Sequence, residues 1–270
     1  MDLNTIRTVL RPSGRDALPV HTAGDAFLAG GTWLFSEPQR DLARLVDLQA
    51  LAWPALVMSD GTLSIGATCT MEQLDRFATE AGWPASALVR DCCRALWGSF
   101  KIWNAATVGG NLCLALPAAP MAALLGALDG SCTIWSANGH TGSVAASDFI
   151  RAPQTNCLQP GDMLRQIDVP ASRLHDRYAV RQASLTMEGR SAALLVGRAA
   201  GNGMVLTVTA SVPRPLRLTF GTIPDQASLM RAIDAAAGTG GWYDDVHGAP
   251  DWRRHMTLRL ADEIRRELSA

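Results

Sequence analysis

The 270-residue sequence has little lysine, little tyrosine and no excess of either charge. Of its 24 basic residues only Lys101 is a lysine, and tyrosine occurs twice. The basic residues are balanced by 25 acidic ones, so the formal net charge is -1. A near-neutral chain creates no strong field to attract nucleic acid or an anionic membrane surface. We therefore expect a small molecule or another protein as the partner, with no nucleic acid and no membrane.

Long apolar runs and paired metal ligands are also missing from the sequence. No stretch approaches the roughly 18 uninterrupted apolar residues of a spanning helix, and residues 1–4 lack the basic segment of a secretory signal. No two cysteines have the two-residue gap with which one loop presents two thiolates to zinc or iron. We expect a cytoplasmic protein without a metal site, in which any iron–sulfur cluster belongs to another chain. Reduced, mostly buried thiols are expected at Cys69, Cys92, Cys93, Cys113, Cys132 and Cys157.

Several common catalytic and nucleotide-binding motifs are absent as well. The sequence contains no Gly-x-Gly-x-x-Gly, no Walker lysine, no His-Glu-x-x-His and no Gly-x-Ser-x-Gly. The usual dinucleotide, nucleotide-hydrolase, zincin and esterase sites therefore have no support. The five histidines stand singly in polar turns or on a helix face, and we interpret them as surface or structural residues.

Hydrophobic patterning predicts a mixture of strands and helices in the first half of the chain. Short apolar runs between residues 25 and 66 are separated by turns, which is typical of strands. Thr70-Met71-Glu72-Gln73 fits a capping box at the start of a helix. Further helices are predicted over residues 86–96 and 118–128, and the segment 107–111 is predicted to be a turn.

A domain boundary is predicted near residue 172, where Pro170 ends an alternating strand over residues 163–169. Before it, a strand at residues 132–135 is followed by the hairpin signal Asn138-Gly139. After it, the pattern predicts four strands of a largely antiparallel sheet and two helices. Asp251 is expected to cap the last helix, whose apolar positions recur every four residues.

Two glycine pairs are the strongest candidate binding motifs. They are Leu28-Ala29-Gly30-Gly31-Thr32 and Thr107-Val108-Gly109-Gly110-Asn111. Glycine has no Cβ atom, so such a turn lets backbone amides approach a pyrophosphate, while a threonine hydroxyl or an asparagine amide adds a directed hydrogen bond. Each pair alone is also consistent with a plain turn. Together they make a split phosphate-binding site a candidate, beside the interpretation of both pairs as plain turns.

These motifs, in this order, resemble the FAD-binding medium subunit of the molybdenum hydroxylases, the family of xanthine dehydrogenase and carbon monoxide dehydrogenase. The resemblance rests on both glycine pairs, on Pro117-Ala118-Ala119, on residues 158–164 and on Tyr178-Ala179-Val180-Arg181-Gln182-Ala183-Ser184. It extends to Asp251-Trp252-Arg253-Arg254-His255 near the C-terminus. The match therefore covers nearly the whole chain.

The resemblance implies an α+β fold of the PCMH type. Residues 1–172 would form the FAD-binding domain, with subdomains of about 1–55 and 56–172, and residues 173–270 would form a C-terminal domain of antiparallel sheet and helices. It also implies electron transfer from a large molybdopterin-binding subunit, through a small [2Fe-2S] subunit, to FAD and then to an external acceptor. The complex is expected to be a heterotrimer, or a dimer of heterotrimers, and substrate chemistry would take place in another chain.

The resemblance also implies roles for individual residues. One side of the diphosphate would be bound by Phe27, Leu28, Ala29, Gly30, Gly31, Thr32, Trp33 and Leu34. The other side would be bound by Thr107, Gly109, Gly110 and Asn111. Leu164 would contact the adenine, Trp97 would lie against the flavin, and Arg181 would lie near the isoalloxazine, where its charge would favour the anionic reduced ring. No catalytic residue is expected in this chain.

The sequence departs from the family pattern at three notable positions. Trp103 stands where arginine is common, Leu116 replaces a frequent serine, and Pro120 stands where many members have an aspartate that bonds the cofactor. Each lost side-chain hydrogen bond is worth on the order of 1 kcal/mol. Two alternatives therefore remain: a structural subunit of the same complex that no longer holds FAD, and a self-sufficient PCMH-type flavin oxidase.

Overall fold

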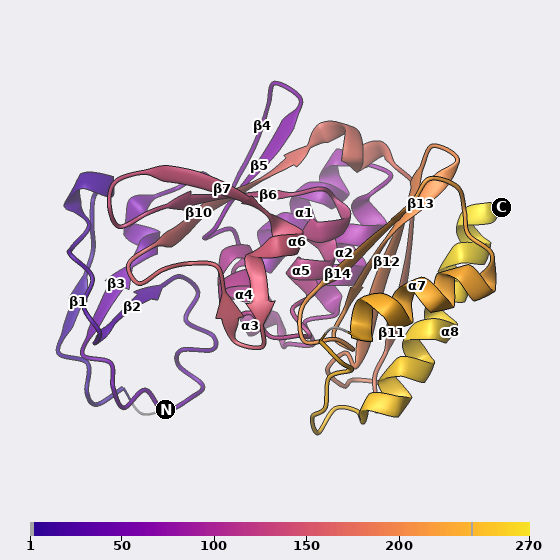
Figure 1. Cartoon of the computed structure of the whole chain (residues 1–270). Helices are drawn as coiled ribbons and strands as arrows, with labels where there is room; N and C mark the ends of the chain where they lie inside the picture. The colour runs from indigo at the N-terminus through magenta and orange to yellow at the C-terminus, as the bar shows by residue number, and fades with distance from the viewer. Residues whose placement is uncertain (1–2, 239) are drawn as a thin grey trace.

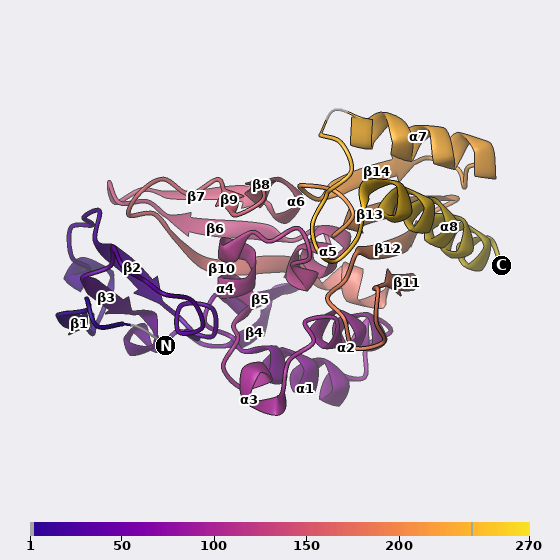
Figure 2. The ribbon, with the colours of Figure 1, turned by 90° about the horizontal axis from the view of Figure 1, so that it is seen from below.

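The computed structural model describes residues 3–238 and 240–270. Three larger sheets follow one another along the chain, and Figure 1 shows them from the N-terminal strands at the left to the C-terminal helices at the right. Seen from below in Figure 2, most of the helices lie beside the second and third sheets. This mixture of helices and largely antiparallel strands confirms the predicted α+β class.

The first sheet is small and parallel, with the strand order β1-β3-β2. Its strands are β1 (Thr8–Leu10), β3 (Arg44–Asp47) and β2 (Asp25–Leu28). The central strand buries Leu45 and Val46. Arg44 joins β3 to β2 through its Nε atom, 2.7 Å from Oδ1 of Asp25, and through a second bond from Nη2 to Oδ2. This ion pair lies at the start of β2, and the first glycine loop follows the other end of the strand, after Leu28.

The second sheet has five antiparallel strands in the order β4-β5-β10-β6-β7. These are β4 (Leu56–Ser59), β5 (Thr62–Gly66), β10 (Met163–Pro170), β6 (Ser131–Trp135) and β7 (Thr141–Ala145). The predicted hairpin at Asn138-Gly139 is present, and a second hairpin turns at Asp60-Gly61. A separate ribbon pairs β8 (Ile150–Ala152) with β9 (Thr155–Asn156).

Helices pack beside the second sheet and form one hydrophobic core with it. They are α1 (Met71–Ala81), α2 (Ser86–Arg94), α4 (Val108–Leu114), α5 (Pro120–Ala127) and α6 (Ala146–Phe149). The short helix α3 (Phe100–Trp103) has no buried residue and lies outside this core. The capping box predicted at Thr70 is confirmed: its hydroxyl accepts from the Gln73 amide, and the Gln73 side chain accepts from the Thr70 amide. All eight residues of α5 are buried, since this helix is apolar on every side and lies between the second and third sheets.

The third sheet is an antiparallel meander, β11-β12-β13-β14. Its strands are β11 (Tyr178–Ala183), β12 (Ala193–Ala200), β13 (Gly203–Thr209) and β14 (Leu216–Phe220). Helices α7 (Gln226–Gly238) and α8 (Pro250–Ser269) cover one face, and α5 packs on the other. Because both faces of β12 are buried, its residues 193–196 form an apolar run rather than alternating with polar residues.

Two local predictions are wrong. Residues 107–111 are not a simple turn, because Thr107 is the N-cap of α4 and the glycines lie in its first turn. Asp251 is not the cap of the last helix, which begins one residue earlier at Pro250 with Ala249 as N-cap. Proline suits this first position because its missing N–H would have no partner there.

Two expectations about the whole chain can be compared with the structure. All six cysteines lie in the described part and are free thiols, and four of them are buried. Of the helices in the described residues, none is both long and apolar enough to cross a membrane.

Candidate cofactor site

A cavity of about 550 Å³ lies where the first sheet, the helices of the second sheet and the third sheet meet. Its walls come from the loop after β2, the segment between α2 and α4, the segment between α4 and α5, and the loop after β11. The lining residues are Phe27, Leu28, Ala29, Gly30, Gly31, Thr32, Trp33, Leu34, Ser36, Ala95, Leu96, Trp97, Gly98, Ile102, Ala106, Thr107, Gly110, Asn111, Cys113, Leu114, Leu116, Ala118, Ala119 and Arg190. Twelve of the fifteen predicted site residues are among them.

The first glycine pair is a tight loop pressed against the opposite wall of the cavity. A Cβ atom at Gly30 would lie 1.8 Å from the carbonyl oxygen of Ala105, so no other residue fits without a shift of the backbone. Gly31 has a φ of +69°, and a Cβ there would lie 2.6 Å from the ring of Phe35. The Phe35 amide closes the loop by donating to the Gly31 carbonyl at 2.8 Å.

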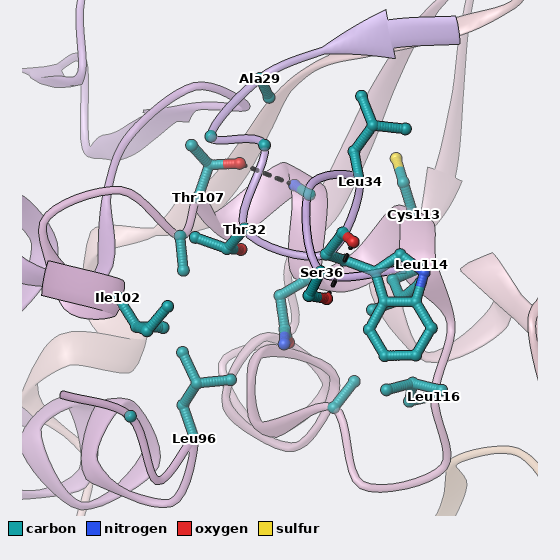
Figure 3. Close-up of a pocket in the computed structure, with 18 of the residues that line it drawn as sticks. Ala29, Thr32, Leu34, Ser36, Leu96, Ile102, Thr107, Cys113, Leu114 and Leu116 are labelled. Carbon is teal, nitrogen blue, oxygen red and sulfur yellow. Dashed lines mark hydrogen bonds between the residues drawn. The ribbon is translucent and has the colours of Figure 1, made fainter. Parts of the chain in front are cut away.

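The second glycine pair belongs to the first turn of α4. The Thr107 hydroxyl accepts a hydrogen bond from the Gly110 amide at 3.0 Å, which caps the helix (Figure 3). Gly109 faces away from the cavity: a Cβ there would lie 2.6 Å from both the Cβ and the carbonyl oxygen of Ala67. Thr107 and Gly110 therefore line the cavity, whereas Gly109 lets α4 pack closely against the residues that follow β5.

Asn111 and Pro120 shape the part of the cavity near α5. The Asn111 carboxamide oxygen accepts from the Met121 amide at 3.1 Å and so holds the first turn of α5. Pro120 is buried at the start of α5 and does not line the cavity, whereas Leu116 and Ala118 do. One oxygen that could serve a cofactor is thus already used within the chain. Asn111 lines the cavity, and no described residue accepts a hydrogen bond from its Nδ2 group.

Trp97 lies at the mouth of the cavity in a strained conformation. Its φ is +38°, which is uncommon for a bulky residue, and its side chain is 45% exposed. The chain turns back directly afterwards, since a Cβ at Gly98 would lie 2.8 Å from Cγ2 of Ile102. Strained residues of this kind are concentrated at binding sites, where the surrounding structure holds them in place. The position suits the predicted contact of Trp97 with a flat ring.

Leu164 and Arg181 lie outside the cavity lining, unlike their predicted placements. Leu164 lies on β10, and its side chain is buried in the core of the second sheet. Arg181 lies on β11, where Glu267 holds its Nη2 atom at 2.6 Å and Glu263 holds its Nε atom at 3.2 Å. Both carboxylates belong to α8, which packs on the face of the third sheet opposite α5. The Arg181 guanidinium therefore points toward α8. Sequence alone does not reveal the pairing, because the partners are more than 80 residues away.

Sequence reasoning missed several lining residues. Ser36, Leu96, Cys113 and Leu114 lie within three residues of predicted positions, so proximity in the sequence could have indicated them. Ile102 lies five residues from Trp97 and from Thr107. Burial raises the pKa of the Cys113 thiol to about 12, and the side chain remains a neutral thiol at physiological pH. Arg190 is 80 residues from the second glycine pair, and no motif marks it.

The donor set and the shape of the cavity suit FAD. Backbone amides, the Thr107 hydroxyl and the Asn111 amide are neutral donors of the kind that bind a diphosphate, and the apolar side chains around them suit a flat ring system. The absence of Cβ atoms at Gly30 and Gly110 leaves space that a side chain would fill. A Cβ at Gly110 would lie 2.7 Å from the Thr107 hydroxyl oxygen. The residues present therefore fit the group that the sequence predicts.

Comparison with known proteins agrees with this geometry. The sequence profile of the family described as "FAD binding domain in molybdopterin dehydrogenase" matches residues 15–172. A glyceraldehyde dehydrogenase medium chain from Sulfolobus acidocaldarius is 37% identical over 73 residues. That alignment covers 27% of this chain and 26% of the relative, so it spans about a quarter of each protein.

Solved structures share the fold over nearly the full length. Reconstituted CO dehydrogenase from Oligotropha carboxidovorans superposes with a TM-score of 0.82 at 22% identity, covering 98% of this chain and 97% of the other. Quinoline 2-oxidoreductase from Pseudomonas putida 86 gives a TM-score of 0.78 at 19% identity, with coverages of 97% and 95%. At these identities the similarity establishes the architecture, and the predicted PCMH-type fold is confirmed.

Proposed function

The chain belongs to the family of FAD-binding domains of molybdopterin dehydrogenases, and we propose from this premise that it is the electron-transfer subunit of a molybdenum hydroxylase. In this role it binds FAD and passes electrons from [2Fe-2S] clusters in a partner subunit to an external acceptor. The observation that carries the proposal is the cavity in which both glycine loops meet, with the Gly30 backbone against the opposite wall and Thr107 capping α4.

The chain's own residues bind and orient the cofactor. The backbone of residues 28–32 and the Thr107 hydroxyl would hold the diphosphate, and Asn111 would donate from its amide nitrogen. Leu96, Trp97 and Leu116 would enclose the ring and limit the access of water. Bound FAD supplies the chemistry by accepting electrons and passing them on. Because the substrate reaction belongs to another subunit, no residue of this chain is assigned a catalytic role.

The proposed partners are a large molybdopterin-binding subunit and a small [2Fe-2S] subunit, assembled as a heterotrimer or a dimer of heterotrimers. The relative from Sulfolobus acidocaldarius is named as a medium chain, which supports a multisubunit assembly. We also propose the division predicted from sequence, with FAD-binding subdomains of about 1–55 and 56–172 and a C-terminal domain of residues 173–270. Six free thiols in the described chain support a cytoplasmic location.

A second candidate function is a structural subunit of the same complex that no longer binds FAD. Two observations favour it. The Asn111 oxygen is used by Met121, and Pro120 offers no side-chain acceptor at its buried position. Purification of the assembled complex distinguishes the two functions, since a structural subunit would co-purify with its partners but remain without flavin.

The test uses the chain co-expressed with a large molybdopterin-binding protein and a small [2Fe-2S] protein from the same organism, the partners proposed above. The purified [2Fe-2S] subunit, reduced with dithionite and freed of excess reductant, is mixed anaerobically with the FAD-loaded chain. We expect the flavin absorbance near 450 nm to bleach as the clusters reoxidise. A chain that carries FAD but is not reduced by these clusters would contradict the electron-transfer role. A chain without flavin in the assembled complex would support the structural role and contradict FAD binding.

A further inference from the structure

The cavity carries very little charge for a site that would hold an anionic cofactor. Among the lining residues that the structure describes, Arg190 is the only one with a charged side chain. Arg181, the cation predicted for this site, lies outside the lining and is neutralised by two glutamates. Among the described residues that line this cavity, the full positive charge therefore comes from Arg190.

Arg190 is an exposed residue on an anchored backbone, and no described residue pairs with its guanidinium. The next residue, Ser191, is buried, and its hydroxyl accepts from Nε2 of Gln182 at 2.9 Å. The Gly189 amide donates to the Thr186 carbonyl at 3.0 Å, which closes the loop on the other side. Within the described residues the Arg190 side chain has no hydrogen bond and no ion pair. Its charge is therefore free to act on a ligand.

Buried Arg253 places this loop at one end of the cavity. Its Nη1 atom donates to the carbonyl of Ala192 at 2.9 Å and also to that of Ala210, whose amide in turn donates to the Pro117 carbonyl at 2.8 Å. Arg190 is thus tied to the wall that contains Leu116. In Figure 3, Leu96 and Leu116 lie away from Ala29 and Thr107, which belong to the two glycine loops. If FAD binds with its diphosphate at the glycine loops and its ring at the Leu96 and Leu116 end, the ring would lie beside Arg190.

We propose that Arg190 is a positioning residue that supplies positive charge beside the flavin ring and stabilises its reduced, anionic form. This inference rests on the proposed function. When the ring takes up two electrons and one proton it gains one negative charge, and a nearby cation lowers the free energy of that form by Coulomb attraction. The diphosphate, which carries the same charge in both redox states, is bound by the neutral donors of the glycine loops.

The test compares the full-length chain with Arg190→Gln, Arg190→Lys and the matched control Arg231→Gln. Arg231 is an exposed arginine on α7, which covers the opposite face of the third sheet, so its replacement makes the same change of charge away from the cavity. Three quantities are measured for each protein: the Kd for ADP, the Kd for oxidised FAD, and the midpoint potential of the bound flavin. ADP carries the diphosphate without the ring.

In Arg190→Gln we expect the affinity for ADP and for oxidised FAD to stay within about threefold of the wild type. The affinity for reduced FAD should fall about tenfold, which lowers the midpoint potential by about 30 mV for a two-electron couple. Arg190→Lys should restore most of this potential, and Arg231→Gln should match the wild type.

An unchanged potential in Arg190→Gln would overturn the inference, and so would an equal loss of ADP and FAD affinity, because the residue would then serve the diphosphate. A wild-type chain that binds neither ligand would instead contradict the proposed function itself. The two failures are therefore distinguishable in one set of measurements.

Discussion

The two glycine pairs look alike in sequence but do different work in the structure. Gly30 and Gly31 form a loop that touches the opposite wall of the cavity, and Gly31 adopts a left-handed conformation. Gly109 and Gly110 lie in a helix with ordinary backbone angles, and only Gly110 faces the cavity. The shape of the site requires both glycines of the first pair. In the second pair, Gly109 is required by the packing of α4 against Ala67. A sequence motif therefore indicates where a site lies, but the role of each residue in the motif becomes clear only from the structure.

The largest effect is expected from Gly30→Ala. The new Cβ would meet a backbone oxygen at 1.8 Å, so the loop and the Ala105 segment must move apart and the cavity changes shape. Overpacking of this kind costs about 3 kcal/mol. We expect the affinity for FAD to fall about 100-fold, measured by fluorescence titration of protein whose circular dichroism matches the wild type. An affinity within threefold of the wild type would show that the loop does not shape the site.

Gly109→Ala should mainly lower stability. Its Cβ would press on Ala67 at 2.6 Å, and the better helix propensity of alanine offsets part of the cost. We expect the free energy of unfolding to fall by about 1 to 2 kcal/mol in urea denaturation, with FAD affinity within threefold of the wild type. Gly142→Ala is the control, because nothing lies within 4 Å of its new Cβ. If Gly109→Ala reduced FAD affinity as strongly as Gly30→Ala, the two glycine pairs would be equivalent after all.

Replacing Thr107 by valine tests its hydroxyl group, which caps α4 and also lines the cavity. The change keeps the shape of the side chain but removes the acceptor for the Gly110 amide. Loss of such a cap costs about 1 kcal/mol. We expect a comparable loss of stability and about a fivefold weaker affinity for FAD, by calorimetric titration. Thr107→Ser keeps the hydroxyl and should behave as the wild type; equal losses in both variants would refute the role of the hydroxyl.

The smallest effect is expected from the ion pair between Asp25 and Arg44, at the start of the strand that precedes the first glycine loop. Hydrogen bonding to Arg44 lowers the pKa of Asp25 to about 2, against about 3.9 for an unfolded aspartate. The stabilisation is therefore complete above about pH 4 and is lost as the pH falls toward 2. We expect Asp25→Asn to cost about 1 kcal/mol at pH 7 and progressively less below pH 4, by urea denaturation at each pH. A difference that does not depend on pH would contradict this account.

Much of the fold follows from local sequence patterns. The hairpin at Asp60-Gly61, the capping box at Thr70 and the apolar stripe of α8 each depend on residues close together in the chain, and the structure contains all three. The helical start at Thr107 was less visible, because Gly109 and Gly110 are poor helix formers and tertiary packing against Ala67 outweighs their propensity.

The site was less predictable than the fold. Residues within the motifs reach the cavity because the motifs themselves form its walls. Arg181 forms ion pairs with α8, and Arg190 reaches the cavity from the loop between β11 and β12. Both depend on contacts between residues more than 70 positions apart in the sequence. Such contacts leave no periodic pattern in the sequence, and only the folded chain reveals them.

The most direct test of the account is the flavin content of the purified full-length chain. The visible spectrum is recorded first, and the flavin released on denaturation is then identified and quantified by chromatography. The account predicts about one FAD per chain, or one FAD taken up per chain when the cofactor is added. A colourless chain that takes up no added FAD would contradict the assignment of this cavity as the cofactor site.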